Sequence, residues 1–280
     1  MQLSMGTDVK YRLRLVLNFI KNFNFIYFRI DNNISSVNSD QIIPNLIYQT
    51  TKSKWLPRKY YKDIKQFRVK NPDFSFITFD QKSMSAWMKL NFKNEMILNA
   101  YLASKFGVMQ SDIFKYCYGY RNGGISLDIS KYFSQPLNKI FDDLNHEMIL
   151  SQQSDENDTE KIRSSEFFNL NLNNALLINW CFATSANNPA LLGVIRIIEN
   201  NFIETQGKVF SDTKLAIWEN TGPIAFNRGL LNSFNAKLPK KVSISKIDFG
   251  ENKWPKFQSS NLVNIFSKHY TEHINCTIFN

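Results

Sequence analysis

The stretch from residue 42 to residue 80 constrains the fold more than any other part of the sequence. Residues 42–49 (IIPNLIYQ) form a short apolar run with β-branched residues and an early proline, which is typical of a strand. In the basic stretch that follows, Tyr60, Ile64 and Phe67 have helical spacing. Residues 71–80 (NPDFSFITFD) start with turn residues and continue with alternating apolar ones. Strand, helix and strand in this order predict a parallel α/β sheet.

The chain is long enough to form one sizeable domain. It has 280 residues, of which 43% are hydrophobic and 14% aromatic. We expect a catalytic domain over residues 42–280 and a separate extension over residues 1–41. The three cysteines, Cys117, Cys181 and Cys276, are far apart and form no CxxC pair. This argues against a disulfide framework and a zinc site, and it favours a reducing compartment.

Residues 10–30 have the pattern of a basic amphipathic helix. Apolar residues recur at spacings of three and four, with arginines and lysines among them, at Leu13, Val16, Ile20, Phe23, Tyr27 and Ile30. Such a helix can rest in a membrane interface or pack on its own domain, and both interpretations are open. Residues 31–41 are polar and rich in turn residues, which indicates a linker. The sequence has neither a long apolar run nor a secretory signal, so we expect a cytoplasmic protein, peripheral to the inner face of a membrane under the first interpretation.

The charge of the chain predicts attraction to anions. The formal net charge is +10 and the isoelectric point is near 9.4, which suits nucleic acid, acidic lipid, an acidic glycan or a nucleotide diphosphate. Lysines and arginines are concentrated between residues 52 and 70. This concentration is either a solvated helix face or a surface that faces an anion.

A second helix and strand are predicted around a pair of glycines. A helical stripe ends at Asn122-Gly123-Gly124 and consists of Leu102, Phe106, Met109, Ile113, Cys117 and Tyr120. A strand over residues 125–130 follows, in which Ser126, Asp128 and Ser130 share the polar face. Further on, we expect a polar loop or insertion over residues 151–174, a strand over 176–184 and a helix over 190–202.

The polar face of the predicted strand carries acidic and hydroxyl side chains at Ser126, Asp128 and Ser130. Acidic and hydroxyl side chains at a strand end can offer oxygen ligands to a hard cation and to ribose hydroxyls. When a sugar leaves a nucleotide diphosphate, the diphosphate gains negative charge, and a cationic group must receive that charge.

Here the sequence resembles glycosyltransferase family 32, whose members carry a DXD motif on a GT-A fold. The strongest match is SDIFKYCYGYRNGGISLDIS at residues 111–130, where the family has SD, a basic residue three positions later, and GGIYLDxD. IPNLIYQT at residues 43–50 is similar to the family's opening IPKIIHQT. Weaker landmarks are Asn71-Pro72, Asn179 ten positions before Pro189, and Thr221-Gly222-Pro223. The resemblance implies a GT-A-like, Rossmann-type mixed sheet flanked by helices.

The resemblance also implies roles for individual residues. Asp112 and Lys115 would contact the donor sugar or its phosphates, and Asp128 would contact ribose and the metal shell. Asp112 and Asp128 are thus the expected catalytic residues. The other expected donor contacts are Tyr48, Gln49, Thr50, Gly124, Ser130 and Asn179. Without the resemblance, Asp112 and Lys115 would be read as an ordinary ion pair on one helix.

Two positions depart from the family pattern. Ser130 stands where the second Asp of the motif is expected, and Lys115 where Arg is usual. We therefore expect Mn²⁺ or Mg²⁺ to bind weakly at Asp128 and Ser130, because a neutral hydroxyl replaces a carboxylate poorly. Lys131 could neutralise the diphosphate instead.

The remaining histidines and tryptophans are weaker candidates. His269 could lie near the diphosphate or metal, as a late His does in the family. His269 and His273 are four apart, but a histidine pair without a third ligand is more often structural. Trp180 and Trp218 are read as core residues, with stacking on a base or sugar as the alternative.

The resemblance to glycosyltransferase family 32 implies a hexosyltransferase that retains anomeric configuration. Its partners would be a UDP- or GDP-linked sugar and a glycan or glycolipid acceptor. The alternative is a catalytically degenerate protein that binds sugar or nucleotide without turnover, because of Ser130. A nucleic-acid binder would explain the charge, but no recognised nucleic-acid motif accompanies it, so we expect no nucleic-acid partner.

Overall fold

The computed structural model describes residues 27–34, 41–131, 133, 136–141, 143–151, 177–234, 239–244, 271 and 273–280. Predictions that concern residues 1–26, residues 152–176 and His269 lie outside this described part. Within it, no helix is long and apolar enough to cross a lipid bilayer.

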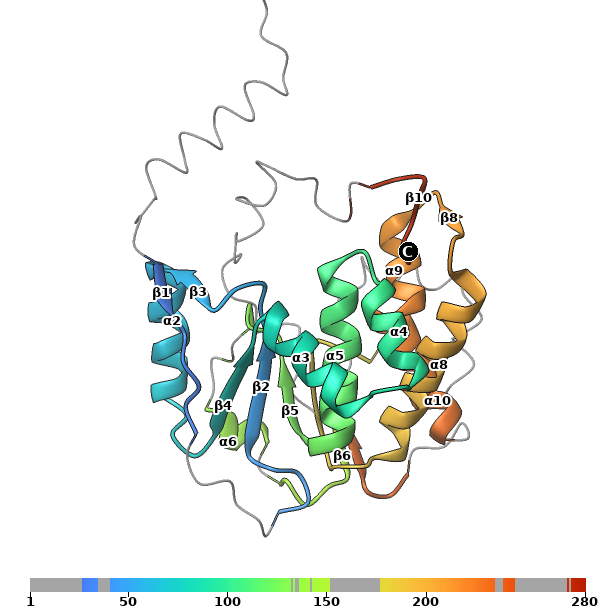
Figure 1. The fold of residues 1–280 in the computed structure, drawn as a ribbon. Helices are drawn as coiled ribbons and strands as arrows, with labels where there is room; N and C mark the ends of the chain where they lie inside the picture. The colour runs from blue at the N-terminus through green and yellow to red at the C-terminus, as the bar shows by residue number, and fades with distance from the viewer. Residues whose placement is uncertain are drawn as a thin grey trace, which may run out of the picture.

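A six-stranded mixed sheet forms the centre of the molecule (Figure 1). Its strand order is β4 (Ser75–Phe79), β2 (Leu46–Thr50), β5 (Gly124–Leu127), β7 (Cys181–Thr184), β6 (Met148–Leu150) and β9 (Val242–Ile244). Strand β2 is parallel to both β4 and β5, whereas β7 is antiparallel to β5 and β6. The predicted α/β class with a mixed sheet flanked by helices is confirmed.

Two small antiparallel sheets accompany the central one. Strand β1 (Tyr27–Arg29) pairs with β3 (Trp55–Pro57), and β8 (Val209–Phe210) pairs with β10 (Cys276–Thr277). The helices are α2 (Arg58–Val69), α3 (Gln81–Asn91), α4 (Met96–Ala103), α5 (Gly107–Asn122), α6 (Leu137–Ile140), α8 (Pro189–Thr205), α9 (Thr213–Asn220) and α10 (Pro223–Phe234).

Apolar side chains cover both faces of the sheet. One face packs under α3, α4, α5, α8, α9 and α10, in a core that includes Tyr48, Ile113 and Phe182. The other face packs against α2 and α6, in a core that includes Ile47, Phe67 and Leu137. Since side chains alternate along a strand, Tyr48 and Ile47 enter different cores, and the sheet is buried on both sides.

The predicted strand, helix and strand appear as β2, α2 and β4, and the parallel pairing of β2 with β4 is confirmed. The basic stretch forms α2, with Ile64 and Phe67 buried. The prediction that this basic stretch is a solvated helix face holds only in part. Arg58, Lys62 and Lys65 are exposed, but Arg68 is buried.

Several predictions differ from the structure. The end of the helix predicted over residues 10–30 is instead strand β1, which pairs with β3, and the strand predicted over residues 176–184 begins only at Cys181. The helical stripe that starts at Leu102 spans two helices, since α4 ends at Ala103 and α5 begins at Gly107, and Leu102 is exposed. Ser104 interrupts the helix because its backbone bridges to Phe279, near the carboxyl terminus. The strand predicted over residues 125–130 ends at Leu127, since Lys131 N donates to Asp128 O in a turn.

Candidate functional site

The sheet topology places three polar positions at one edge. Thr50 ends β2, and Asp128 directly follows the parallel strand β5. Strand β7 runs the opposite way, so Asn179, two residues before it, reaches the same edge, where Asp128 N donates to Trp180 O at 2.9 Å. Helix α5 precedes β5 through a tight turn and reverses the chain. Its amino-terminal half, with Asp112, therefore passes over this edge.

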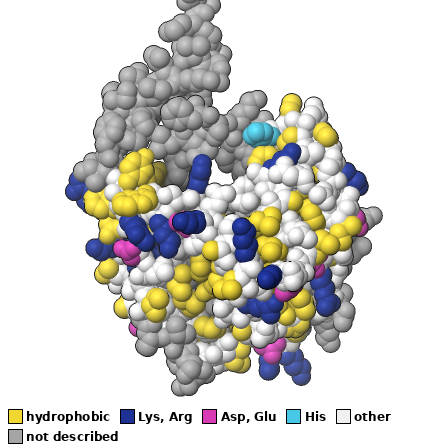
Figure 2. Space-filling model, viewed as in Figure 1, with side chains coloured by type: hydrophobic (Ala, Val, Ile, Leu, Met, Phe, Trp, Pro, Cys, Tyr) yellow, Lys and Arg dark blue, Asp and Glu magenta, His cyan; other side chains and the backbone are white. Residues whose placement is uncertain are grey.

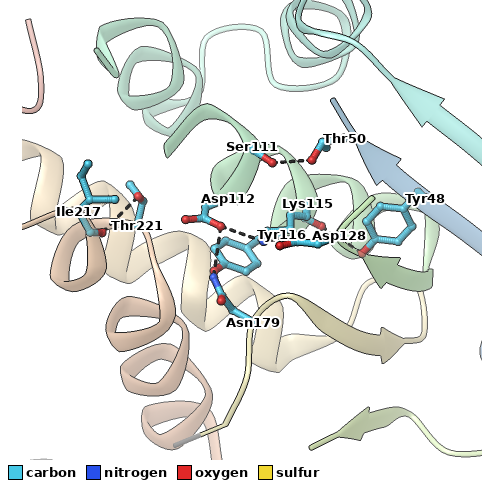
Figure 3. Close-up of polar contacts among 10 residues, drawn as sticks. All are labelled: Tyr48, Thr50, Ser111, Asp112, Lys115, Tyr116, Asp128, Asn179, Ile217 and Thr221. Atoms are coloured by element: carbon cyan, nitrogen blue, oxygen red, sulfur yellow. Dashed lines mark hydrogen bonds and ion pairs between the residues drawn. The ribbon is translucent and has the colours of Figure 1, made fainter. Parts of the chain in front are cut away.

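At the centre of this edge, Lys115 bridges two carboxylates (Figure 3). Its Nζ lies 2.9 Å from Asp112 Oδ1 and 3.3 Å from Asp128 Oδ1. The side chains of Asp112 and Lys115 are each 6% exposed, whereas that of Asp128 is 35% exposed. One ammonium group therefore faces two carboxylates, and Asp128 is the member of the cluster that solvent can reach.

Burial and charge act against each other within this cluster. Burial raises the pKa of Asp112 to about 6, although the Lys115 ammonium opposes that rise. Burial alone would lower the pKa of Lys115, but attraction to Asp112 and Asp128 outweighs it, and the pKa of Lys115 is raised above its ordinary value. Lys115 is therefore a fixed cation at neutral pH, whereas Asp112 changes its protonation state near pH 6.

Asn179 and Tyr116 complete the polar network around Asp112. Asn179 Nδ2 donates to Asp112 Oδ1 at 3.2 Å and to the Tyr116 hydroxyl at 2.8 Å. Tyr116 is fully buried, and its ring stacks on Phe226 of α10. The Asp112 carboxylate is thus oriented from two directions, by Lys115 and by Asn179.

The segment that carries Asn179 is fixed from α10. Leu177 N donates to Asn227 Oδ1 at 3.0 Å, and Asn227 Nδ2 donates to Leu177 O at 2.8 Å. Asn227 is buried, so this pair of hydrogen bonds forms away from water. Asn227 is therefore a positioning residue for Asn179.

Strand β2 supports the amino-terminal half of α5 in two ways. The hydroxyls of Thr50 and Ser111 lie 2.5 Å apart. The Tyr48 hydroxyl donates to Lys115 O at 3.1 Å. Its side chain is only 1% exposed. Tyr48, an expected donor contact, thus supports α5 from within the core and offers a ligand no side-chain surface.

Gln49 and Gly124, two other expected donor contacts, lie apart from the cluster. Gln49 Oε1 accepts from Arg68 Nη2 at 3.3 Å and faces α2, on the opposite side of the sheet from Tyr48. Gly124 is at the other end of β5 from Asp128 and pairs with Thr184. It has a positive φ of 102°, and a Cβ there would lie 2.6 Å from Leu46 O. Its role is to permit the close turn from α5 into β5.

The turn after β5 presents further groups at the same edge. Ser130 and Lys131 are half-buried. Lys131 Nζ lies 4.8 Å from the centre of the Trp180 ring, which itself packs on the core. Since the strand has already ended, strand alternation does not point Lys131 away from the site. Its role toward a diphosphate stays a prediction.

The residues at this edge fit a divalent cation poorly. Asp128 is a single carboxylate and already has the Lys115 ammonium beside it, and Ser130 adds a neutral hydroxyl. Within the described residues there is no group of three or more His, Cys, Asp or Glu that could hold a metal ion. A hard cation prefers several oxygen ligands, with carboxylates among them. We therefore assign no step to a metal.

Ser111, Tyr116, Arg68 and Asn227 were not among the expected site residues. Ser111 and Tyr116 flank Asp112 on α5, and Tyr116 is four positions from it, so helical spacing was the available signal. The pairings of Arg68 with Gln49 and of Asn227 with Leu177 join segments far apart in the chain, for which the sequence has no local signal. His273 packs against Phe106, with ring centres 5.3 Å apart.

Comparisons with known proteins give a structural similarity at low sequence identity. No protein-family model matches the chain, and no curated protein sequence matches it. Among solved structures, the chain is similar to "PaToxG Glycosyltransferase", with a TM-score of 0.49 and 15% sequence identity. The match covers 82% of this chain and 81% of that chain. A similarity at this level assigns no activity, so the function has to be inferred from the site itself.

The site combines groups suited to a charged, hydroxyl-rich ligand. Carboxylates such as those of Asp112 and Asp128 can accept hydrogen bonds from hydroxyls, and the Lys115 ammonium holds the two carboxylates in place. Lys131 adds a positive charge at the rim. Because Asp112 and Lys115 are buried, solvent screens their ion pair less than it screens an ion pair on the surface.

Proposed function

We propose that the protein is a glycosyltransferase that moves a hexose from a nucleotide-diphosphate sugar to a hydroxyl of a glycan or glycolipid acceptor, with retention of anomeric configuration. The observation that carries this proposal is the contact of Lys115 with both Asp112 and Asp128 at one edge of the sheet, with Asp128 open to solvent. The three residues come from the segment that resembles glycosyltransferase family 32.

In the proposed complex, each group of the site has a separate task. Asp128 accepts hydrogen bonds from the ribose hydroxyls, and Asp112 accepts them from the sugar. Lys115 holds both carboxylates in fixed positions, which lowers the entropic cost of orienting the donor. Lys131 attracts the diphosphate as its negative charge grows.

The proposed reaction replaces one bond at the anomeric carbon. The bond from this carbon to the diphosphate oxygen breaks, and the acceptor hydroxyl oxygen bonds to the carbon on the same face of the sugar. The acceptor proton passes to the departing diphosphate oxygen. Since Ser130 replaces a carboxylate, dependence on Mn²⁺ or Mg²⁺ is expected to be weak.

Ser130 also favours a second function, a degenerate transferase that binds a nucleotide sugar without turnover. Both functions are tested by a thermal-shift panel of UDP- and GDP-sugars with and without Mn²⁺, followed by a donor-hydrolysis assay. A ligand at about 100 times its Kd should stabilise the protein by roughly 2.7 kcal/mol. Binding with hydrolysis supports the enzyme, and binding without hydrolysis in any metal supports the degenerate protein. If no nucleotide sugar raises the Tm, both functions are wrong.

A further inference from the structure

The sheet of β1 and β3 presents aromatic side chains to solvent. In this two-stranded ribbon, Phe28 and Leu56 are paired and face inward, where Phe28 stacks on Tyr61 and Leu56 is buried. The alternate positions face outward. Tyr27 is 40% exposed and Trp55 is 57% exposed. Tryptophan and tyrosine are the side chains most suited to a membrane interface, because each has an apolar ring and a polar atom.

Positive charge surrounds these aromatic rings. Residues 27–34 and 52–65, which include the ribbon and most of α2, contain seven Lys or Arg and two Asp. Arg58, Lys62 and Lys65 are all exposed and are spaced to share one face of α2. Figure 2 shows hydrophobic side chains gathered over β1 and β3, with lysines and arginines beside them. An exposed aromatic group within a basic surface is complementary to anionic lipid head groups.

The ribbon lies next to the candidate site. Residues 51–54 connect Thr50, at the site, to Trp55, and the five Cα–Cα steps between these two residues span at most roughly 18 Å. Ile129, between Asp128 and Ser130, packs on the small core formed by Ile30, Leu56 and Ile64 beneath the ribbon. The turn that carries Asp128 and the inner face of the ribbon therefore form one packed unit.

We infer that the outer face of the β1–β3 ribbon and the basic face of α2 dock on an anionic membrane surface, so that the candidate site meets an acceptor held in that membrane. The membrane contact itself stands on the exposed aromatic and basic side chains. The acceptor class, a glycolipid or other membrane-anchored glycan, rests on the proposed function.

Co-sedimentation of the full chain with vesicles tests this inference. Vesicles of phosphatidylcholine alone are compared with vesicles that also contain phosphatidylserine. We expect binding to the anionic vesicles only, weakened by salt. Each cation near an anionic surface contributes about fivefold to binding, so the double variant Arg58→Gln/Lys62→Gln should bind about 25-fold more weakly. Trp55→Ala should also weaken binding. These side chains are exposed, and an unchanged Tm verifies folding.

A matched variant on α3 serves as the control. Lys82→Gln/Lys89→Gln removes the same charge from another exposed helix and should leave binding nearly unchanged. The inference is overturned if both double variants weaken binding equally, if Trp55→Ala and the α2 variant bind like the wild type, or if neutral vesicles bind equally well. Donor binding measured without vesicles separates the two proposals. A wild-type protein that binds anionic vesicles but no nucleotide sugar refutes the proposed function, and one that binds a nucleotide sugar but no anionic vesicles refutes the docking surface.

Discussion

Two buried cations lie on opposite sides of strand β2, and their surroundings differ in one decisive way. Lys115 contacts two carboxylates, one of which reaches solvent. The hydrogen bonds of Arg68 instead go to neutral oxygens. Arg68 donates to Thr78 Oγ1 at 2.7 Å, to the Asp31 carbonyl oxygen at 2.6 Å and to Gln49 Oε1 at 3.3 Å. Burial lowers the pKa of Arg68 to about 10, whereas the pKa of Lys115 is raised.

This difference separates a site from a structural tie. The hydrogen bonds of Arg68 join α2, two strands and the segment after β1, so they hold the fold together. The single ammonium group of Lys115 faces two carboxylates, and the second of these, Asp128, is accessible to solvent.

The largest expected effect is the loss of stability in Lys115→Met. This substitution leaves Asp112 buried and unpaired, so the free energy of unfolding should fall by about 3–5 kcal/mol, as measured by urea denaturation. The double variant Lys115→Met/Asp112→Asn removes the unpaired charge and should recover much of the loss. Equal stability of Lys115→Met and the wild type would show that the ion pair of Lys115 with Asp112 does not form in solution.

Asp128→Asn should act on turnover more than on stability. An Asn side chain accepts hydrogen bonds at its oxygen but not at its nitrogen, whereas both carboxylate oxygens of Asp accept. We therefore expect the donor-hydrolysis rate to fall about 100-fold or more. Asp143→Asn, at another exposed carboxylate, is the control and should keep full activity. A wild-type rate in Asp128→Asn would remove this residue from the site.

Arg68→Met should show the opposite pattern. Gln49 and Thr78 lose their donor, which should cost about 1–3 kcal/mol of unfolding free energy. The donor Kd, measured on the folded protein, should remain unchanged. A large rise in donor Kd would mean that the Arg68 side of β2 belongs to the site after all.

The smallest effect concerns pH. Because the pKa of Asp112 is raised to about 6, this carboxylate is protonated below that pH and ionised above it. Donor affinity should therefore rise as the pH increases through about 6 and level off above it. Asp112→Asn should remove this rise, and a pH profile that is identical in the variant would assign the titration to another group.

The sequence was most informative where structure is local. The β2–α2–β4 unit and the turn at Gly123 follow from apolar spacing and glycine chemistry. Helix α5 also followed, although its start was missed because the break at Ser104 depends on Phe279, far along the chain. The spacing of Asp112 and Lys115 predicted their ion pair, but not that the pair is buried.

What the sequence did not provide is the orientation of side chains across the sheet. Tyr48, Gln49 and Thr50 are consecutive, yet one enters the core under α5, one meets Arg68 and one contacts Ser111. Alternation predicts that neighbours diverge, but the partner on each face comes from a helix at a distance in the chain. The contacts of Asn179 with Asp112 and of Asn227 with Leu177 are equally non-local.

Isothermal titration of nucleotide sugars tests the central claim most directly, using the wild type, Asp128→Asn and Arg68→Met. If the Lys115 cluster holds the donor, one nucleotide sugar should bind the wild type and Arg68→Met with the same affinity and bind Asp128→Asn markedly more weakly. Equal binding to all three proteins, or stronger impairment in Arg68→Met than in Asp128→Asn, would contradict the assignment of the donor to this side of β2.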